Sequence, residues 1–189
     1  MAKLTEIKTD RLLLRQWLTD DLADFATLNS DPEVMEFLPC ILNREKSDAM
    51  AEKIKGLIVE NGWGFWAVEV IDSKKFVGFV GLNRPAYELP VYSCVEIGWR
   101  LAREHWGKGY ATEAAKASLD FAFNELDLDE VYSFTSVFNK KSSAVMERLK
   151  MVDQHSNFNH PMVPDTSKYQ EHVLYKISRR QWADNHLSR

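Results

Sequence analysis

The stretch "CVEIGWRLAREHWGKGYATEAAKASLDFAF", residues 94–123, decides the fold, because a strand pattern passes through two glycines into a helix pattern. Up to Leu101 the apolar side chains alternate with polar or small ones, as in a strand with one buried face. From Ala111 onward they recur at helical spacing. Gly107 and Gly109 are two of only eight glycines in the chain, and they lie between these patterns. The sequence thus predicts a strand, a glycine-containing turn and a helix in immediate succession.

A turn of this kind is suited to hold a phosphate group. The first N–H groups of a helix have no partner within the helix, and its N-terminus carries about half a positive charge. Glycine allows unusual backbone dihedrals and a close approach of the main chain to an anion. The pattern therefore predicts a phosphate cradle, although the two glycines would equally suit a plain tight turn.

Two familiar phosphate motifs fit this turn less well. The Walker motif requires GxxxxGK followed by Ser or Thr, whereas Lys108 lies between the glycines and neither residue follows it. The dinucleotide fingerprint GxGxxG would place its third glycine at Thr112. The next strand would also have to end in an acid, but it ends at Asn139. An NAD-dependent dehydrogenase is therefore the weaker alternative.

The rest of the chain interleaves strand and helix patterns without internal repeats or Pro/Gly-rich linkers. Strand patterns occur at 11–17, 65–70, 76–82, 94–102, 131–138 and 172–178, and helix patterns at about 20–31, 43–61, 110–124 and 139–151. Interleaved strands and helices predict a mixed α/β class built on one sheet. We expect a single domain over residues 1–178, followed by a C-terminal tail at 179–189.

Composition bounds the function further. A chain of 189 residues with 45% hydrophobic and 28% charged residues is typical of one soluble globular domain. The net charge of -4 argues against a nucleic-acid-binding surface. The N-terminus has no apolar segment of a secretory signal, and no run approaches the roughly 20 apolar residues of a membrane span. Because Cys40 and Cys94 form no disulfide framework, we expect a cytoplasmic protein with reduced thiols.

Taken in order, these fragments resemble the GNAT superfamily of acetyl-CoA-dependent N-acetyltransferases, in particular its ribosomal-protein N-terminal (RimJ/RimL-like) branch. The acyl-CoA motif of the family, Gln/Arg-x-x-Gly-x-Gly/Ala, maps onto residues 106–111, with Trp106 in the first position. The segments "TDRLLLRQW", "SDPEVMEFL", "EIGWRL", "NKKSSAVMERLKM" and "HVLYKIS" match other parts of the branch. One departure is Lys150, which precedes Met151 where the family usually has glycine.

The resemblance implies a GNAT fold and acetyl-CoA as co-substrate, without a metal. The implied fold is a central, mostly antiparallel sheet of about seven strands with a splayed pair, flanked by about four helices. In such a fold the main-chain N–H groups of the turn hold the pyrophosphate, Lys108 adds charge and Thr112 adds a hydroxyl. The main chain of the preceding strand binds the pantetheine arm. The residues assigned to the cofactor are Ile97, Trp99, Leu101, Trp106, Gly107, Lys108, Gly109, Tyr110, Ala111, Thr112, Asn139 and Ser142.

Acetyl transfer to an amine requires a base, because an α-amine has a pKa of ~8 and a lysine one of ~10.4. Glu96 alternates with the apolar set of its strand and so projects from the opposite face. A partly desolvated carboxylate there would have a raised pKa, which suits proton transfer. The branch also carries a glutamate at this place. Glu96 is therefore the candidate base, with an ordered water as the alternative.

Asn139 and Ser142 lie at the start of a short helix pattern, where both residue types are favoured caps. The resemblance gives them further roles, with Asn139 binding the cofactor and Ser142 giving a proton to the departing sulfur. A tyrosine is the acid in other branches, so Tyr110 and Tyr175 remain alternatives.

The acceptor implied by the resemblance is a primary amine, with a protein or peptide N-terminus marginally preferred. A small amine (antibiotic, polyamine or amino acid) and a non-catalytic CoA-binding module on the same fold are the alternatives. We expect the amine-binding side to come from the first two helices and from residues 158–170, whose acids could attract a cation. These acids are Asp31, Glu33, Glu36 and Asp165.

No nucleic acid or membrane is expected as a partner, and a homodimer is compatible with the sequence. His105, His155, His160 and His172 show no metal-ligand spacing.

Overall fold

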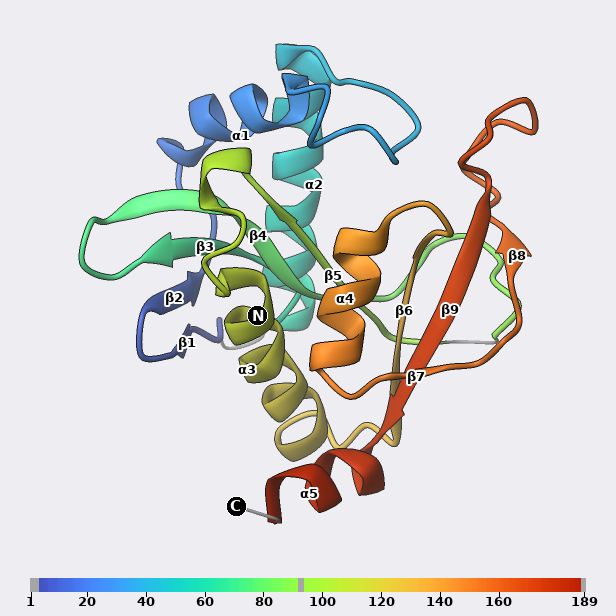
Figure 1. The fold of residues 1–189 in the computed structure, drawn as a ribbon. Helices are drawn as coiled ribbons and strands as arrows, with labels where there is room; N and C mark the ends of the chain where they lie inside the picture. The colour runs from blue at the N-terminus through green and yellow to red at the C-terminus, as the bar shows by residue number, and fades with distance from the viewer. Residues whose placement is uncertain (1–3, 92–93, 188–189) are drawn as a thin grey trace. The chain divides into compact units, whose positions relative to one another are not determined.

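The computed structural model describes residues 4–91 and 94–187 (Figure 1). The described residues divide into two compact units. Unit 1 comprises residues 4–36, 40–82 and 98–118, and unit 2 comprises residues 37–39, 83–91, 94–97 and 119–187. Strand β5 (Glu96–Leu101) and helix α3 (Tyr110–Asn124) each contribute residues to both units.

Unit 1 contains a run of antiparallel strands. Its strands are β1 (Ile7–Lys8), β2 (Leu12–Arg15), β3 (Phe65–Val70) and most of β4 (Lys75–Asn83). Each of these strands pairs with the next one along the chain, and β3 and β4, at two of the predicted strand positions, form a hairpin. Leu12, Leu14 and Trp66 are fully buried. The register places all three on one face of the sheet, because Leu14 pairs with Val68 and side chains two residues apart on a strand share a face.

Two helices complete unit 1, α1 (Asp21–Ser30) and α2 (Arg44–Asn61), and they pack against each other (Figure 1). Helix α2 has the predicted ends. The side chain of Asn43 accepts a hydrogen bond from the Lys46 N–H at 3.0 Å, and Gly62 ends the helix at φ 82°. Both are ordinary capping devices, an asparagine N-cap and a left-handed glycine after the last turn.

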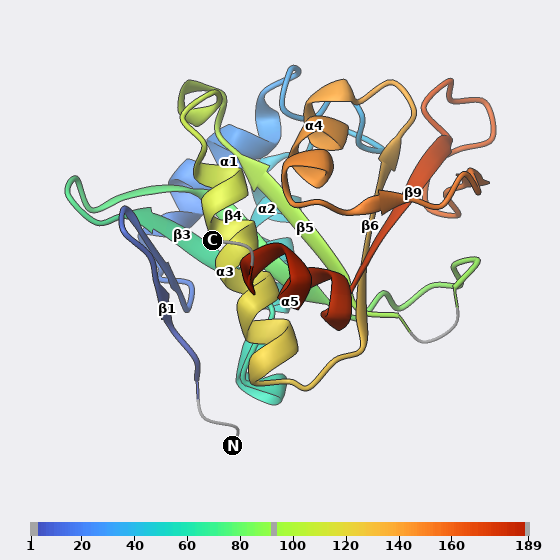
Figure 2. The same cartoon turned by 60° about the horizontal axis from the view of Figure 1, so that its bottom comes forward.

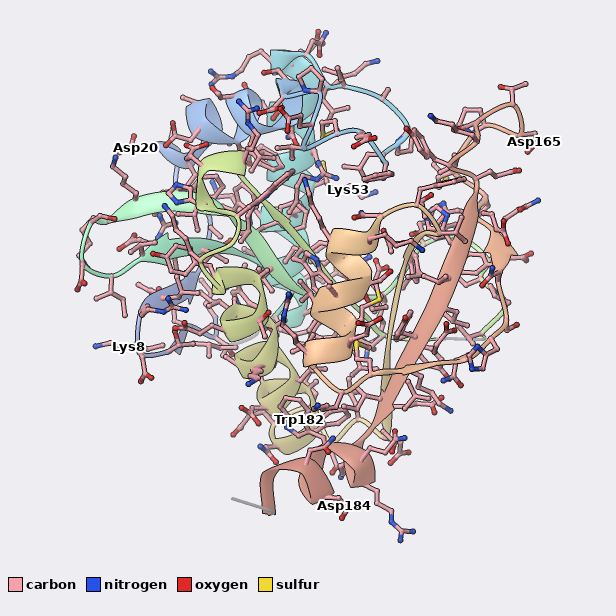
Figure 3. The ribbon with its side chains drawn as sticks, in the orientation of Figure 1. Lys8, Asp20, Lys53, Asp165, Trp182 and Asp184 are labelled. Atoms are coloured by element: carbon pink, nitrogen blue, oxygen red, sulfur yellow. The ribbon has the colours of Figure 1, made fainter. Side chains whose placement is uncertain are left out.

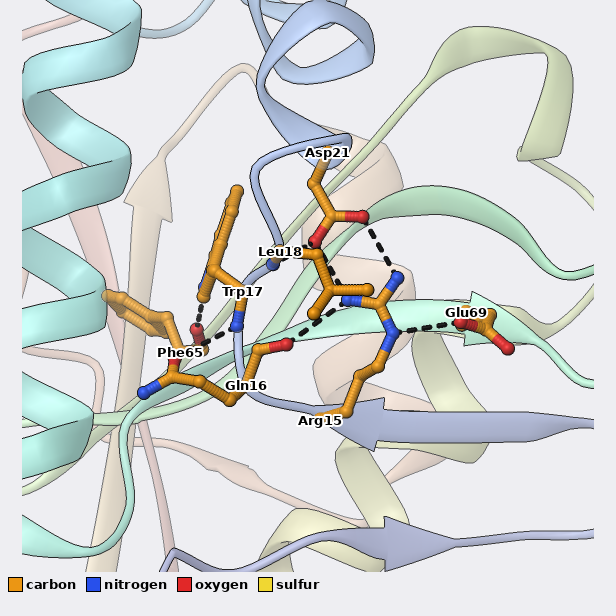
Figure 4. A network of polar contacts seen from close by, with 7 residues as sticks. All are labelled: Arg15, Gln16, Trp17, Leu18, Asp21, Phe65 and Glu69. Atoms are coloured by element: carbon orange, nitrogen blue, oxygen red, sulfur yellow. Dashed lines mark hydrogen bonds and ion pairs between the residues drawn. The ribbon is translucent and has the colours of Figure 1, made fainter.

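The start of helix α1 carries the residue types of a cap and of first-turn acids, and Asp21 is one of the acids in its first turn. Asp20 occupies the capping position but makes no side-chain cap hydrogen bond. Asp21 is buried and binds the guanidinium of Arg15, which also binds Glu69 on β3 (Figure 4). An ion-pair network therefore ties the start of α1 to the sheet in place of a local cap.

Unit 2 is organised around β9 (Glu171–Ser178). Antiparallel to it run β6 (Glu130–Ser136), β7 (Val152–Asp153) and β8 (Phe158–Asn159). The first residue of β5, Glu96, pairs in parallel with Tyr132 of β6. Helix α4 (Lys140–Arg148), at a predicted helix position, packs on β6 and buries Val145 and Met146 (Figure 1).

Residues 179–187, which the sequence assigned to a tail, form helix α5 (Arg179–Leu187). Trp182 on this helix is buried, and its indole N–H donates to Asp120 Oδ1 of α3 at 2.8 Å. Its ring also lies against Phe123, with centroids 6.1 Å apart. Figure 2 shows α5 beside this end of α3, and Figure 3 labels Trp182. One anchoring tryptophan in a polar segment gives little periodicity, so the helix was missed.

The predicted class, a mixed and mostly antiparallel α/β fold, is confirmed. The longer strands lie at the predicted places. Three two-residue strands, β1, β7 and β8, bring the total to nine over the described residues, and α5 brings the helices described there to five. None of the helices in the described part of the chain is long and apolar enough to cross a membrane.

Candidate active site

The glycine turn lies in unit 1, between the 3-10 turn Arg103–His105 and helix α3. Gly107 and Gly109 have φ values of 73° and 82°. This left-handed region disfavours a side chain, which explains the two glycines. Residues 107–109 are exposed, and a Cβ atom added at Gly107 would meet nothing within 4 Å. The space beside the turn is therefore open.

The N-terminus of α3 leaves its first N–H groups unclaimed by the helix. The first hydrogen bond of the helical ladder runs from the Glu113 N–H to the Gly109 carbonyl at 3.0 Å. The N–H groups of Tyr110, Ala111 and Thr112 precede this ladder and have no acceptor within the helix. Together with the positive end of the helix dipole, they are suited to bind an anion from outside.

A brace from the turn between β1 and β2 holds the glycine turn. Arg11 donates from Nη1 to the Lys108 carbonyl at 3.0 Å and from Nε to Glu113 Oε2 at 2.6 Å. Thr9 Oγ1 donates to Glu113 Oε1 at 2.6 Å. Partial burial opposes ionisation, but these hydrogen bonds keep the pKa of Glu113 below its ordinary value. Glu113 lies in the first turn of α3, and no local signal in the sequence points to these partners about 100 residues away.

Trp106, which replaces the Gln or Arg of the family motif, anchors the turn to the end of β5. Its indole N–H donates to the Leu101 carbonyl at 2.8 Å. In unit 2, the Ile97 carbonyl accepts a hydrogen bond from Ser133 Oγ at 3.0 Å. Each carbonyl keeps a second lone pair. The binding of pantetheine by the main chain of Ile97, Trp99 and Leu101 stays a prediction.

Glu96, in unit 2, has the properties expected of a base near neutral pH. Its Oε1 accepts a hydrogen bond from Asn83 Nδ2 at 2.7 Å. Burial raises the pKa of Glu96 to about 7, although the hydrogen bond from Asn83 opposes the shift. A carboxyl group with such a pKa is partly ionised at neutral pH and can accept a proton efficiently.

Two buried histidines lie elsewhere in unit 2, and sequence reasoning gave them no role. His160 Nε2 lies 3.2 Å from the Tyr87 hydroxyl, and the rings of His160 and His172 are 4.7 Å apart. Burial, helped by His172, lowers the pKa of His160 to about 4, so its ring is neutral. Over the described residues, no group of three or more His, Cys, Asp or Glu side chains could hold a metal ion.

The start of α4 is capped by its own sequence. Asn139 Oδ1 accepts from the Ser142 N–H at 3.2 Å, and Asn139 Nδ2 donates to Thr135 Oγ1 at 3.0 Å. The predicted capping role of Asn139 is confirmed. Within the described part of the chain, the half-buried Ser142 hydroxyl makes no hydrogen bond, so it remains available as a donor.

The alternative acids are placed differently. Tyr175 is buried, and burial raises the pKa of its hydroxyl, with Asp153 and Glu147 adding to the shift. Tyr110 lies beneath the guanidinium of Arg11, 4.9 Å from the ring centroid. Neither environment identifies the acid.

Comparison with known proteins gives one family. The profile described as "Acetyltransferase (GNAT) domain" matches residues 11–152. The uncharacterized protein YkkB of Bacillus subtilis (strain 168) is 31% identical over 152 residues, which cover 80% of this chain and 87% of YkkB. A crystal structure of a GNAT-family acetyltransferase from Bacillus anthracis aligns with a TM-score of 0.78 at 25% identity, covering 93% of this chain and 99% of that one.

Two further relatives carry names that state an acceptor. A spermidine N(1)-acetyltransferase from Vibrio cholerae is 27% identical over 147 residues, covering 76% of this chain and 80% of its own. The crystal structure of a ribosomal-protein-S5-alanine acetyltransferase from Vibrio fischeri has a TM-score of 0.71 at 16% identity, with 94% and 98% of the two chains covered. The second likeness shows a shared fold.

Proposed function

Because this chain belongs to the GNAT family and is an acetyl-CoA-dependent N-acetyltransferase, we propose that its acceptor is the α-amine of a protein or peptide N-terminus. In this reaction the amine nitrogen attacks the thioester carbonyl, a C–N bond forms and the C–S bond breaks. The amine loses a proton, and coenzyme A leaves as the thiol.

The glycine turn fits the pyrophosphate of the co-substrate. Its N–H groups precede the α3 ladder, its surface is exposed, and the Arg11–Glu113 brace holds its shape. Anion binding then needs no side-chain rearrangement, because the donors are main-chain groups of a fixed turn. We assign this grip to residues 106–112, with Asn139 as a further contact to the cofactor.

One observation carries the choice of an α-amine, namely the raised pKa of Glu96. A base with a pKa of about 7 lies roughly one unit below an α-amine but more than three units below a lysine or polyamine nitrogen. Proton transfer from an α-amine to Glu96 is therefore nearly balanced, whereas transfer from an alkyl amine is strongly uphill. The pairing favours an N-terminal acceptor.

The departing sulfur needs less help than the amine, because a thiol has a pKa of only ~8.5. In the proposed mechanism the free hydroxyl of Ser142 donates the proton. Tyr110 and Tyr175 are the alternatives.

A small polycationic amine is the second candidate, since one relative is named a spermidine acetyltransferase. Two acids expected to attract such a cation, Asp31 and Glu33, form ion pairs with Arg103 instead. Their charge is largely compensated within the chain, which favours the peptide acceptor over the polyamine.

The acceptor is tested by measuring thiol release from acetyl-CoA with a panel of amines. The panel contains peptides with a free N-terminus, N-blocked peptides with one lysine, spermidine and free amino acids. We expect the highest kcat/KM for peptides with a free N-terminus. A higher kcat/KM for spermidine or for the blocked lysine peptides would overturn the N-terminal assignment.

Glu96→Gln tests the base. We expect kcat to fall by roughly 10- to 1,000-fold, with acetyl-CoA affinity unchanged. Wild-type activity should fall below pH 7 as Glu96 is protonated, and this limb should be absent in the variant. The pKa of Glu96 is raised in the folded state, so ionisation of this carboxylate lowers the stability of the fold as the pH rises toward 7, and the loss is complete above pH 7. Glu96→Gln removes this charge and should therefore not lower the Tm at pH 8.

The matched control is Glu88→Gln, the same change at an exposed position of the same segment. Its pH profile should equal that of the wild type. Undiminished turnover by Glu96→Gln would assign the proton transfer to an ordered water.

A further inference from the structure

Arg100 on β5 is a charged side chain whose partners in the protein are all neutral. Its Nη1 donates to Asn29 Oδ1 at 2.7 Å and lies 3.8 Å from Met50 Sδ. The guanidinium carbon lies 5.3 Å from the centre of the Phe79 ring. Over the described residues, no carboxylate forms an ion pair with Arg100. All of these groups belong to unit 1.

Another arginine of unit 1 shows what full compensation looks like. Arg15 is buried and binds Asp21 through both Nη atoms, at 2.7 and 2.9 Å, and Glu69 through Nε at 2.8 Å (Figure 4). The Asp21 hydrogen bond, with Glu69, outweighs burial and raises the pKa of Arg15. For Arg100, burial lowers the pKa to about 10, and no acidic neighbour opposes this shift. Arg100 is nevertheless charged at neutral pH, so its charge has no counter-charge.

Part of the Arg100 guanidinium remains available for a ligand. A guanidinium has N–H donors on Nε and both Nη atoms, and the hydrogen bonds described above use Nη1 alone. Within the described part of the chain, the one buried side-chain nitrogen or oxygen without a partner is His105 Nδ1. Nε and Nη2 of Arg100 are not among these fully buried atoms, so each keeps some exposed surface, although most of the guanidinium is buried. Two adjacent donors of a guanidinium match the two oxygens of a carboxylate.

Arg100 contacts the two helices that we expect to bind the amine acceptor. Its partners Asn29 and Met50 belong to α1 and α2, the two helices expected to bind the amine substrate. Asn29 is fully buried and is itself fixed by a hydrogen bond from its Nδ2 to Ser47 Oγ at 2.9 Å. The guanidinium is thus held in place before a ligand arrives, which lowers the entropic cost of binding.

We propose that Arg100 binds a carboxylate of the amine acceptor, so that the preferred acceptors carry an acidic group in addition to the reactive amine. This inference rests on the proposed function and narrows its substrate class. A chain with a net charge of -4 does not attract acidic acceptors by its overall field. The guanidinium of Arg100, with its unused donors, would provide selectivity for acidic acceptors at one place.

Two matched pairs of acceptors distinguish the sources of the carboxylate. Ala-Asp-amide and Ala-Asn-amide differ in a side-chain carboxylate, while alanine and alaninamide differ in the α-carboxylate. We expect the wild type to prefer the acid in at least one pair by about 10-fold or more in kcat/KM, the range of a charge-assisted hydrogen bond. Equal kcat/KM values within both pairs would overturn the proposal.

Variants assign the preference to the side chain. Arg100→Gln keeps a donor for Asn29 but removes the charge, and it should abolish the preference for the acid. Arg100→Lys keeps the charge without the planar fork and should retain part of the preference. Arg44→Gln on α2 removes an exposed arginine that pairs with Asp48, and it should leave the preference intact. A preference that survives in Arg100→Gln would overturn the assignment.

A binding measurement separates this inference from the proposed function. Ala-Asp-amide should raise the Tm of the wild type, as expected for a ligand of the folded state, but not that of Arg100→Gln. If no peptide is acetylated, the N-terminal acceptor is wrong, while the Tm shift still supports the carboxylate subsite. If Ala-Asp-amide shifts neither Tm, or both equally, the subsite is wrong whatever the activity.

Discussion

The N-termini of α3 and α4 solve the same problem in opposite ways. At α4, Asn139 accepts a hydrogen bond from the Ser142 N–H, so the helix satisfies part of its own need for acceptors. At α3, two exposed glycines precede the helix, and residues 110–112 offer N–H groups that the helix does not use. The first terminus is closed by a side chain, whereas the second is open to an external anion.

The contacts that hold these two helix N-termini also differ, since those at α4 are local and those at α3 are remote in sequence. The Asn139 cap is local, since its partners Thr135 and Ser142 are within four residues. The α3 turn is instead held from outside by Arg11, which binds the Lys108 carbonyl and Glu113. A terminus that must present bare N–H groups cannot use them to hold itself together. An open helix terminus with a remote brace is therefore suited to bind an external ligand, whereas a capped terminus needs none.

Of these variants, we expect Gly109→Trp, at the open N-terminus of α3, to have the largest effect, a loss of acetyl-CoA affinity. The side chain would block the approach of an anion, and the residue would leave the left-handed region at φ 82°. Loss of about two charge-assisted hydrogen bonds predicts a decrease of roughly 100-fold or more in acetyl-CoA affinity. Calorimetric titration of acetyl-CoA measures this decrease.

The control for this variant is Gly56→Trp, because an added Cβ at Gly56 meets nothing within 4 Å and this glycine lies in α2. It should bind acetyl-CoA as tightly as the wild type. Undiminished affinity in Gly109→Trp would mean that the turn does not hold the cofactor.

Replacement of Asn139 tests whether the capped N-terminus of α4 is only structural. Loss of a cap predicts that Asn139→Ala lowers the free energy of unfolding by about 1 kcal/mol, which urea titration measures. Asn139→Asp should recover this stability, because aspartate is an equally good cap. If the Asn139 amide also contacts the cofactor, acetyl-CoA affinity should stay reduced in both variants. Unchanged affinity in both would make Asn139 a cap alone.

Lys150→Gly tests the far end of α4 and has the smallest expected effect. Lys150 has φ 61°, a left-handed conformation that costs a residue with a side chain about 1–2 kcal/mol, against about 0.5–1 kcal/mol of extra chain entropy for glycine. The midpoints of these two ranges differ by about 0.75 kcal/mol, so we expect a gain of about 0.75 kcal/mol in the free energy of unfolding, measured by urea titration. Lys150→Ala removes the same side-chain charge but keeps the strain, so a gain of equal size in that variant would contradict this explanation.

Lys150 also shows how the departure from the family sequence is accommodated. The sequence resemblance leads us to expect a glycine at this place, and the chain forms a left-handed turn with a lysine instead. The hydrogen bond from the Lys150 N–H to the Glu147 carbonyl, at 2.9 Å, helps to hold it. The turn survives the substitution because the backbone contacts around it do not involve the side chain.

The sequence by itself determined the elements and the position of the glycine turn. Alternation along β5, helical spacing along α3 and the capping residues Asn43 and Asn139 all act over a few neighbouring residues. The same local character explains the failure at α5, whose one anchor, Trp182, acts through Asp120 on another element.

Only the tertiary structure decided the electrostatics of the proposed site. The pKa of Glu96 depends on its burial and on Asn83, the shape of the turn depends on Arg11, and the free charge of Arg100 depends on the neutral groups around it. Desolvation and pairing are set by residues that are distant in the chain and meet only after folding. Local sequence patterns therefore fix where a charged group stands, and folding fixes whether that group is compensated, strained or free to act.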